Sequence, residues 1–209
     1  MSSSMFSALP PEIICQIFEA ADDFSVVAAL AQTARVFYHT WRENPTSICQ
    51  VVGPRIILDF AGAQKLLDVQ EEADAVNQSE DSRENEPKSI TRAKRLIFHA
   101  RCASAAYVTW AESSEPCLKP EAAARFESWF YCVWTLGFMA KTPLLQGKAS
   151  AVLDEYGQLE ISQLEEFTSW AQWYHENEYG SLGLDFCDKV WTAGCELVSL
   201  KRWLDWQSL

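Results

Sequence analysis

The chain has 209 residues, of which 48% are hydrophobic and 22% are charged. These fractions are typical of folded soluble domains and argue against a chain that is disordered throughout. The chain has 17 basic and 29 acidic residues, which gives a net charge of -12. This charge repels the phosphates of nucleic acids and anionic lipids, so neither nucleic acid nor membrane is an expected partner.

The first predicted helix begins at Pro10 and Pro11, because the N–H that proline lacks is not needed in the first turn of a helix. Glu12 follows in that first turn, where its negative charge suits the helix dipole. The apolar residues then recur at helical spacing and form one stripe, which consists of Leu9, Ile13, Ile14, Ile17 and Phe18. We expect this stripe to pack against a partner surface.

Two shorter helices are predicted to follow. Asp22-Asp23 interrupts the apolar pattern and offers a helix cap, and the next apolar residues are Val26, Val27, Leu30 and Ala31. Thr33 is predicted to cap a third helix, which ends at Asn44-Pro45 and carries on one face Val36, Phe37 and Trp41. Three such short helices bury their own apolar faces poorly, so this segment needs further packing partners.

The next part of the chain is read as a turn, a helix and a loop. Gly53-Pro54 predicts a connecting turn, and a helix is predicted near residues 59–76. Between Asp68 and Glu86 eight acidic residues meet a single basic one, Arg83. We therefore predict that residues 78–89 form an acidic, disordered linker.

The second half is predicted to consist of long helices, at about residues 89–113, 120–140, 160–178 and 184–207. Eight of the nine tryptophans lie beyond residue 100 and are expected to supply the main core. Gly137 lies in an aromatic-rich helix, where it is expected to permit close packing of a neighbour. The most apolar stretch, residues 129–140, is too short to cross a bilayer of about 30 Å as a helix.

Few patterns in the chain point to chemistry. The seven cysteines include no CxxC pair, and no nucleotide-binding loop, nucleophile elbow or HExxH zinc motif is present. The strongest catalytic candidate is His99 with Cys102, which share a helical face at i,i+3 spacing. A metal role for His175 with Glu176 and Glu178, and a phosphate-binding role for Arg92, Lys94 and Arg95, are further alternatives. The simpler interpretation treats these groups as structural and predicts no cofactor, no metal and no catalysis.

Residues 9–18 (LPPEIICQIF), residues 23–37 (DFSVVAALAQTARVF) and Trp41 together resemble the F-box. The shared features are the opening Leu-Pro with a nearby Glu, the paired aliphatic residues, the Leu of the second helix and the Arg followed by aromatics in the third. The variant is similar to that of filamentous fungi, and the likeness covers about a quarter to a third of the chain. Asp23-Phe24 departs from the family, which often has a leucine after the acidic residue.

The resemblance implies that the three helices dock on a Skp-type adaptor, which in turn holds a cullin. Carried over residue by residue, it implies adaptor contacts at Leu9, Pro10, Ile13, Ile17, Leu30, Val36 and Trp41. A stripe that packs only on the chain's own later helices is the alternative.

From these features we expect an all-α protein with an F-box in residues 5–50, a connecting helical segment in 51–77, the linker in 78–89 and a helical domain in 90–209. The implied function is that of a substrate receptor in an SCF-type ubiquitin ligase, with an unknown protein substrate recruited by the last domain. The alternative is a non-ligase interaction or structural protein. Residues 1–6 contain neither a basic nor an apolar run, so a cytoplasmic or nuclear location is expected.

Overall fold

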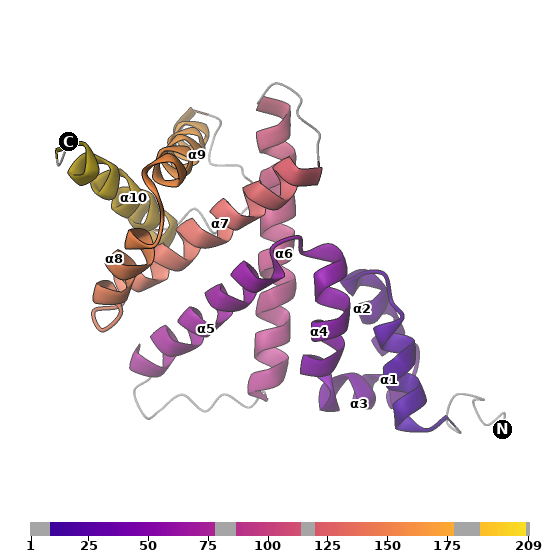
Figure 1. Cartoon of the computed structure of the whole chain (residues 1–209). Helices are drawn as coiled ribbons and strands as arrows, with labels where there is room; N and C mark the ends of the chain where they lie inside the picture. Colours follow the sequence, from indigo (N-terminus) through magenta and orange to yellow (C-terminus); the bar gives the residue numbers. More distant parts are fainter. Residues whose placement is uncertain (1–8, 78–86, 114–119, 178–188, 208–209) are drawn as a thin grey trace. The chain divides into compact units, whose positions relative to one another are not determined.

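The computed structural model describes residues 9–77, 87–113, 120–177 and 189–207. Within these ranges the chain forms ten α-helices and no strand, which confirms the all-α prediction (Figure 1). The described residues belong to two compact units. The first contains everything up to Phe60 together with the start of helix α6 (Lys88–Ser113) as far as Ala100, and the second contains the rest from Ala61 and from Arg101 onward.

Four short helices begin the first unit: α1 (Pro11–Glu19), α2 (Phe24–Thr33), α3 (Arg35–Glu43) and α4 (Pro45–Ile56). The predicted proline start of α1 is confirmed, with Pro10 in the cap position and Pro11 as the first helical residue. The predicted cap of α2 is Asp23. The four helices share a buried core made of Ile14, Phe18, Phe24, Val27, Phe37, Ile48 and Val52.

The prediction that Thr33 caps α3 is wrong. Its hydroxyl donates a 2.7 Å hydrogen bond to the carbonyl oxygen of Leu30, so the group is used inside α2 itself. The cap position of α3 is Ala34, which has no side-chain oxygen to accept a hydrogen bond. A threonine hydroxyl bonds readily to a carbonyl one turn earlier in its own helix, and that local bond removes it from capping the next one.

The predicted turn at Gly53-Pro54 is also wrong, because both residues lie in the last turns of α4. A Cβ atom on Gly53 would overlap the ring of Phe60, so glycine allows that ring to pack against the helix. Near the same end of α4, Arg55 Nη1 donates to the carbonyl oxygens of Glu19, at 2.6 Å, and Ala21, at 2.8 Å. The side chain thus satisfies carbonyls at the end of α1, which has no basic residue of its own there.

The longer helices belong wholly or in part to the second unit. The predicted helices are found as α5 (Phe60–Asn77), α6, α7 (Pro120–Lys141), α9 (Gln158–Asn177) and α10 (Lys189–Gln207). An additional helix, α8 (Gln146–Asp154), was not predicted. Most of the predicted linker, residues 78–86, lies outside the described residues, and its last two positions, Lys88 and Ser89, already belong to α6.

An aromatic cluster fills the second unit. The ring of Phe126 lies 5.3 Å from that of Phe167, 5.4 Å from that of Trp110 and 5.5 Å from that of Tyr107. Phe130 continues the cluster to Trp191, with ring centroids 5.3 Å apart. The prediction that tryptophans build the core is confirmed for the buried Trp134 and Trp191, whereas Trp110, Trp129 and Trp170 are half-buried. The side chains of Trp173, Trp203 and Trp206 lie outside the described set.

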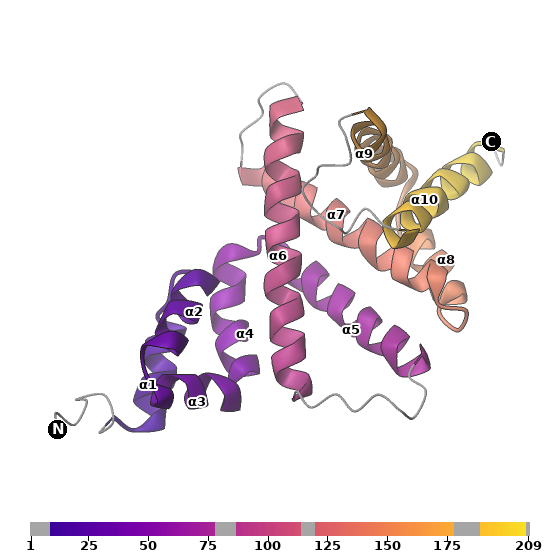
Figure 2. The same ribbon diagram turned by 180° about the vertical axis from the view of Figure 1, so that it is seen from behind.

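Helices α7 and α10 have the most extensive contact of any helix pair in the described structure, and they lie next to each other in both views (Figures 1 and 2). A Cβ atom on Gly194 of α10 would overlap the carbonyl oxygen of Val133, and one on Gly137 of α7 would overlap the carbonyl oxygen of Val190. Each glycine therefore lets the backbone of the other helix come near. The predicted packing role of Gly137 is confirmed, while Gly194 was not singled out in the sequence.

Candidate docking surface

The outer face of α1 carries two of the predicted contact residues. Ile14 and Phe18 are fully buried and point into the first unit. Ile13 and Ile17 are offset from them by one residue, about 100° around the helix, and therefore form the neighbouring column. Ile13 is 40% exposed and Ile17 is half-buried, so this second apolar column borders solvent.

The same arrangement recurs in α2. Phe24 and Val27 are buried, while Val26 is exposed and Leu30, four residues later on the same side, is half-buried. Val26 was not among the predicted contacts, although its i,i+4 spacing to Leu30 places it in the same column. That spacing is the signal by which the sequence could have identified it.

Helix α3 carries both fully buried and half-buried side chains. Phe37 and Thr40 are buried, and the ring of Phe37 packs edge-on against Phe18 at 5.8 Å. Trp41 is half-buried and its ring lies 6.4 Å from that of Phe18, so this predicted contact residue also takes part in the internal packing of α1 and α3. Val36 is half-buried on the adjoining side of the helix.

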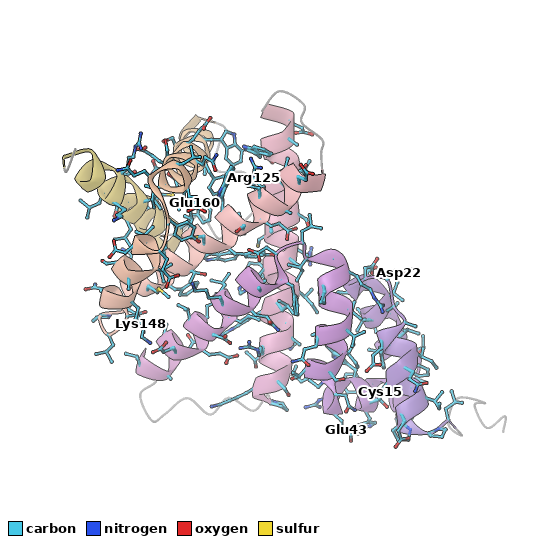
Figure 3. All side chains as sticks on the ribbon, viewed as in Figure 1. Cys15, Asp22, Glu43, Arg125, Lys148 and Glu160 are labelled. Atoms are coloured by element: carbon cyan, nitrogen blue, oxygen red, sulfur yellow. The ribbon has the colours of Figure 1, made fainter. Side chains whose placement is uncertain are left out.

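None of the seven predicted contact residues is fully buried. Pro10 and Ile13 are exposed, and the others, which are half-buried, are Leu9, Ile17, Leu30, Val36 and Trp41. Their exposed portions, with that of Val26, make up what we call the docking surface. Figure 3 labels Cys15 on α1 and Glu43 on α3. Burial raises the pKa of the Cys15 thiol, and the negative charges of Glu19, Glu12 and Glu43 add to this effect in decreasing order.

Asp23 holds the start of α2 in place. One carboxylate oxygen accepts hydrogen bonds from the Ser25 hydroxyl at 2.6 Å, the Ser25 N–H at 2.7 Å and the Val26 N–H at 2.9 Å. The pKa of Asp23 is lowered, mainly by the Ser25 hydroxyl and then by the backbone N–H of Val26, because these bonds favour the charged carboxylate.

The lowered pKa predicts a pH-dependent contribution of Asp23 to the stability of α2. A carboxyl group whose pKa is depressed by folding stabilises the fold above its unfolded-state pKa, and the stabilisation is lost as the pH falls through the folded-state pKa. Asp23→Ala should therefore speed hydrogen–deuterium exchange of the α2 amides at neutral pH, and the difference from wild type should shrink in acid.

Asp23→Ser is the matched control for that measurement, because a serine hydroxyl also caps a helix but has no carboxyl group to titrate. The difference in amide exchange between Asp23→Ser and Asp23→Ala, compared at equal pH, should stay constant across the range. If the difference in amide exchange between wild type and Asp23→Ala is also independent of pH, the titration of Asp23 is not its cause.

The two side chains considered above as catalytic candidates are buried. His99 and Cys102 are both buried in α6, and burial, with a smaller effect of Arg95, lowers the pKa of His99 to about 3. Burial also raises the pKa of the Cys49 thiol to about 12. Across the described ranges, no group of three or more His, Cys, Asp or Glu residues could hold a metal ion. The side chains of His175, Glu176 and Glu178 lie outside the described set.

No family model matches the sequence, and neither the curated proteins nor the solved structures contain a match. The F-box likeness therefore depends entirely on the residues quoted above. A search of the described helices for a stretch long and apolar enough to cross a membrane finds none.

Proposed function

We propose that the chain is an F-box substrate receptor of an SCF-type ubiquitin ligase, which docks on a Skp-type adaptor through α1, α2 and α3 and recruits a protein substrate through its second unit. Its mechanism is proximity, because holding a substrate near a ubiquitin-charged enzyme makes the transfer effectively intramolecular. In this proposal the chain supplies no catalytic group, in keeping with the burial of Cys102. A cytoplasmic or nuclear location is part of the same proposal.

The observation that carries the proposal is the existence of two apolar columns on the same short helices. The inner column, which includes Ile14, Phe18 and Val27, is buried within the first unit. The outer column, which includes Ile13, Ile17 and Leu30, is left partly exposed. A row of exposed apolar side chains beside a filled core is typical of a protein interaction site. Its residues coincide with those that the F-box likeness assigns to adaptor binding.

The second candidate is an interaction or structural protein that has an F-box-like start but joins no ligase. The partly buried Trp41 favours it, because this side chain already packs on Phe18 within the chain. The two candidates differ in one observable property, which is capture of the adaptor.

Co-purification of the full chain with a Skp-type adaptor tests the proposal. An aspartate in the docking surface would become a buried, unpaired charge in the complex. The loss of one central contact of an interface costs on the order of 2–4 kcal/mol. Ile13→Asp and Leu30→Asp are each expected to reduce the captured adaptor by at least about 30-fold.

Val51→Asp is the matched control, since Val51 lies on α4 of the same unit and is 38% exposed, close to the 40% of Ile13. It should be captured as well as wild type. Helical circular dichroism must be the same for all three variants, so that any loss reflects the contact. Equal capture of Ile13→Asp, Leu30→Asp and wild type would contradict the docking proposal.

A further inference from the structure

The solvent side of α3 carries basic and aromatic side chains that are not among the predicted contact residues. We call it the outer face of α3, and its four exposed residues are Arg35, Tyr38, His39 and Arg42. At about 100° per residue, these four positions fall within about 100° around the helix. They lie opposite Phe37 and Thr40, which are buried within the first unit.

The outer face of α3 adjoins the docking surface on both of its edges. Around the solvent side of the helix the residues follow one another in the order Val36, His39, Arg35, Arg42, Tyr38 and Trp41. Val36 and Trp41 belong to the docking surface and are half-buried, so each of them borders one edge. Because the remaining side of α3 is buried, a partner that contacts both Val36 and Trp41 covers the outer face between them.

The outer face carries two positive charges. In the part of the chain that the structure describes, neither Arg35 nor Arg42 forms an ion pair with a carboxylate. The guanidinium carbon of Arg42 lies 5.8 Å from the centre of the Tyr38 ring, and this contact favours a position of the charge on the outer face. Glu43, the one acidic residue of α3, lies on the same side of the helix as Val36 and therefore at the edge.

We propose that the adaptor covers the outer face of α3 with acidic side chains, which pair with Arg35 and Arg42. This pairing rests on the docking function proposed above and adds charged contacts to its apolar ones. An acidic protein surface fits because a guanidinium binds a carboxylate through two parallel hydrogen bonds, and because tyrosine and arginine often dominate the binding energy of protein interfaces. Nucleic acid fits less well, since the net charge of -12 repels its phosphates.

The rates of adaptor binding to the full chain, measured by surface plasmon resonance at several salt concentrations, test the pairing. Complementary charges mainly speed association, and salt screens them. For Arg35→Glu/Arg42→Glu, the association rate constant should fall by about tenfold or more at low salt, and the difference from wild type should shrink at about 0.5 M salt. Arg35→Lys/Arg42→Lys should associate almost as fast as wild type but dissociate faster, because lysine keeps the charge without the paired hydrogen bonds.

Lys88→Glu/Arg101→Glu is the matched control, because it changes the net charge by the same amount at two exposed positions of α6. It should slow association by less than about twofold. Circular dichroism must show the same helix content in all variants. Should Arg35→Glu/Arg42→Glu lose helix content, Arg35→Gln/Arg42→Gln removes both charges without reversing them and should still slow association at low salt.

Three results would overturn the pairing. The first is association of Arg35→Glu/Arg42→Glu at the wild-type rate, and the second is equal slowing by this variant and by the control. The third is single-stranded DNA that binds wild type but not the charge-reversed variant, while adaptor association stays unchanged. A wild-type chain that captures no adaptor would remove the docking function together with the pairing, whereas each of the three results leaves the docking function in place.

Discussion

Gly194→Ala is expected to destabilise the second unit by about 2–3 kcal/mol, although alanine is the better helix former. The added methyl group would overlap the carbonyl oxygen of Val133 and lie 3.1 Å from the backbone nitrogen of Gly137. Both obstacles are main-chain atoms of α7, which cannot rotate away as a side chain can. The two helices must move apart, and their interface is the most extensive one in the unit. Urea unfolding followed by tryptophan fluorescence measures the loss.

Gly147→Ala is the matched control, because it makes the same substitution in a helix of the same unit. Gly147 lies in α8, and a Cβ atom there would have nothing within 4 Å. This change should leave stability unaltered or raise it by about 0.5–1 kcal/mol, through the higher helix propensity of alanine. If both variants shifted the unfolding midpoint in the same direction and by the same amount, close packing at Gly194 would not be the cause.

Phe126→Ala is expected to cost about 3–5 kcal/mol, the range found when a buried aromatic side chain is deleted. Phe126 is fully buried, and rings of two other helices, α6 and α9, surround it, with centroids between 5.3 and 6.2 Å away. All four of these rings, Tyr107, Trp110, Phe167 and Trp170, pack against Phe126 and lose this contact when its ring is removed. The expected result is a large fall in the urea midpoint with increased mobility of these rings, visible as broadened aromatic NMR signals.

Phe138→Ala on the same helix is its control. Phe138 is half-buried, and no aromatic ring of the described cluster stacks on it, so less apolar area and fewer contacts are lost. The cost should be about half that of Phe126→Ala or less. If the two substitutions lowered the free energy of unfolding equally, Phe126 would not be the centre of the aromatic cluster.

Much of the local structure could be predicted from the sequence, because it depends on interactions between near neighbours in the chain. Pro10-Pro11 and Asp23 mark helix starts through the N–H groups of one turn, and the apolar spacing of residues 9–18 follows from helical geometry. The long helices were predictable for the same reason. The cap at Thr33 and the turn at Gly53-Pro54 were predicted wrongly, because the Thr33 hydroxyl bonds to the carbonyl oxygen of Leu30 and Gly53 packs against the ring of Phe60.

The candidate docking surface was only partly predictable. The residues of the F-box-like segment could be read in the sequence, but the division between Ile14 and Phe18 inside and Ile13 and Ile17 outside depends on how α1 is rotated against α3 and α4. That rotation is set by distant partners such as Phe37 and Ile48. Val26 was not predicted as a contact, because the apolar pattern of a helix does not indicate which of its side chains the other helices will bury.

The sequence by itself determined the helical character of the chain, most helix boundaries and the identity of the apolar stripes, since each of these follows from contacts within about one or two turns. Only the tertiary structure decided which stripe is buried, that Gly194 brings two backbones together, that Arg55 closes the end of α1, and that α6 divides between two units. These features join residues far apart in the chain. Their free energy depends on distances and orientations that exist only once the helices have packed.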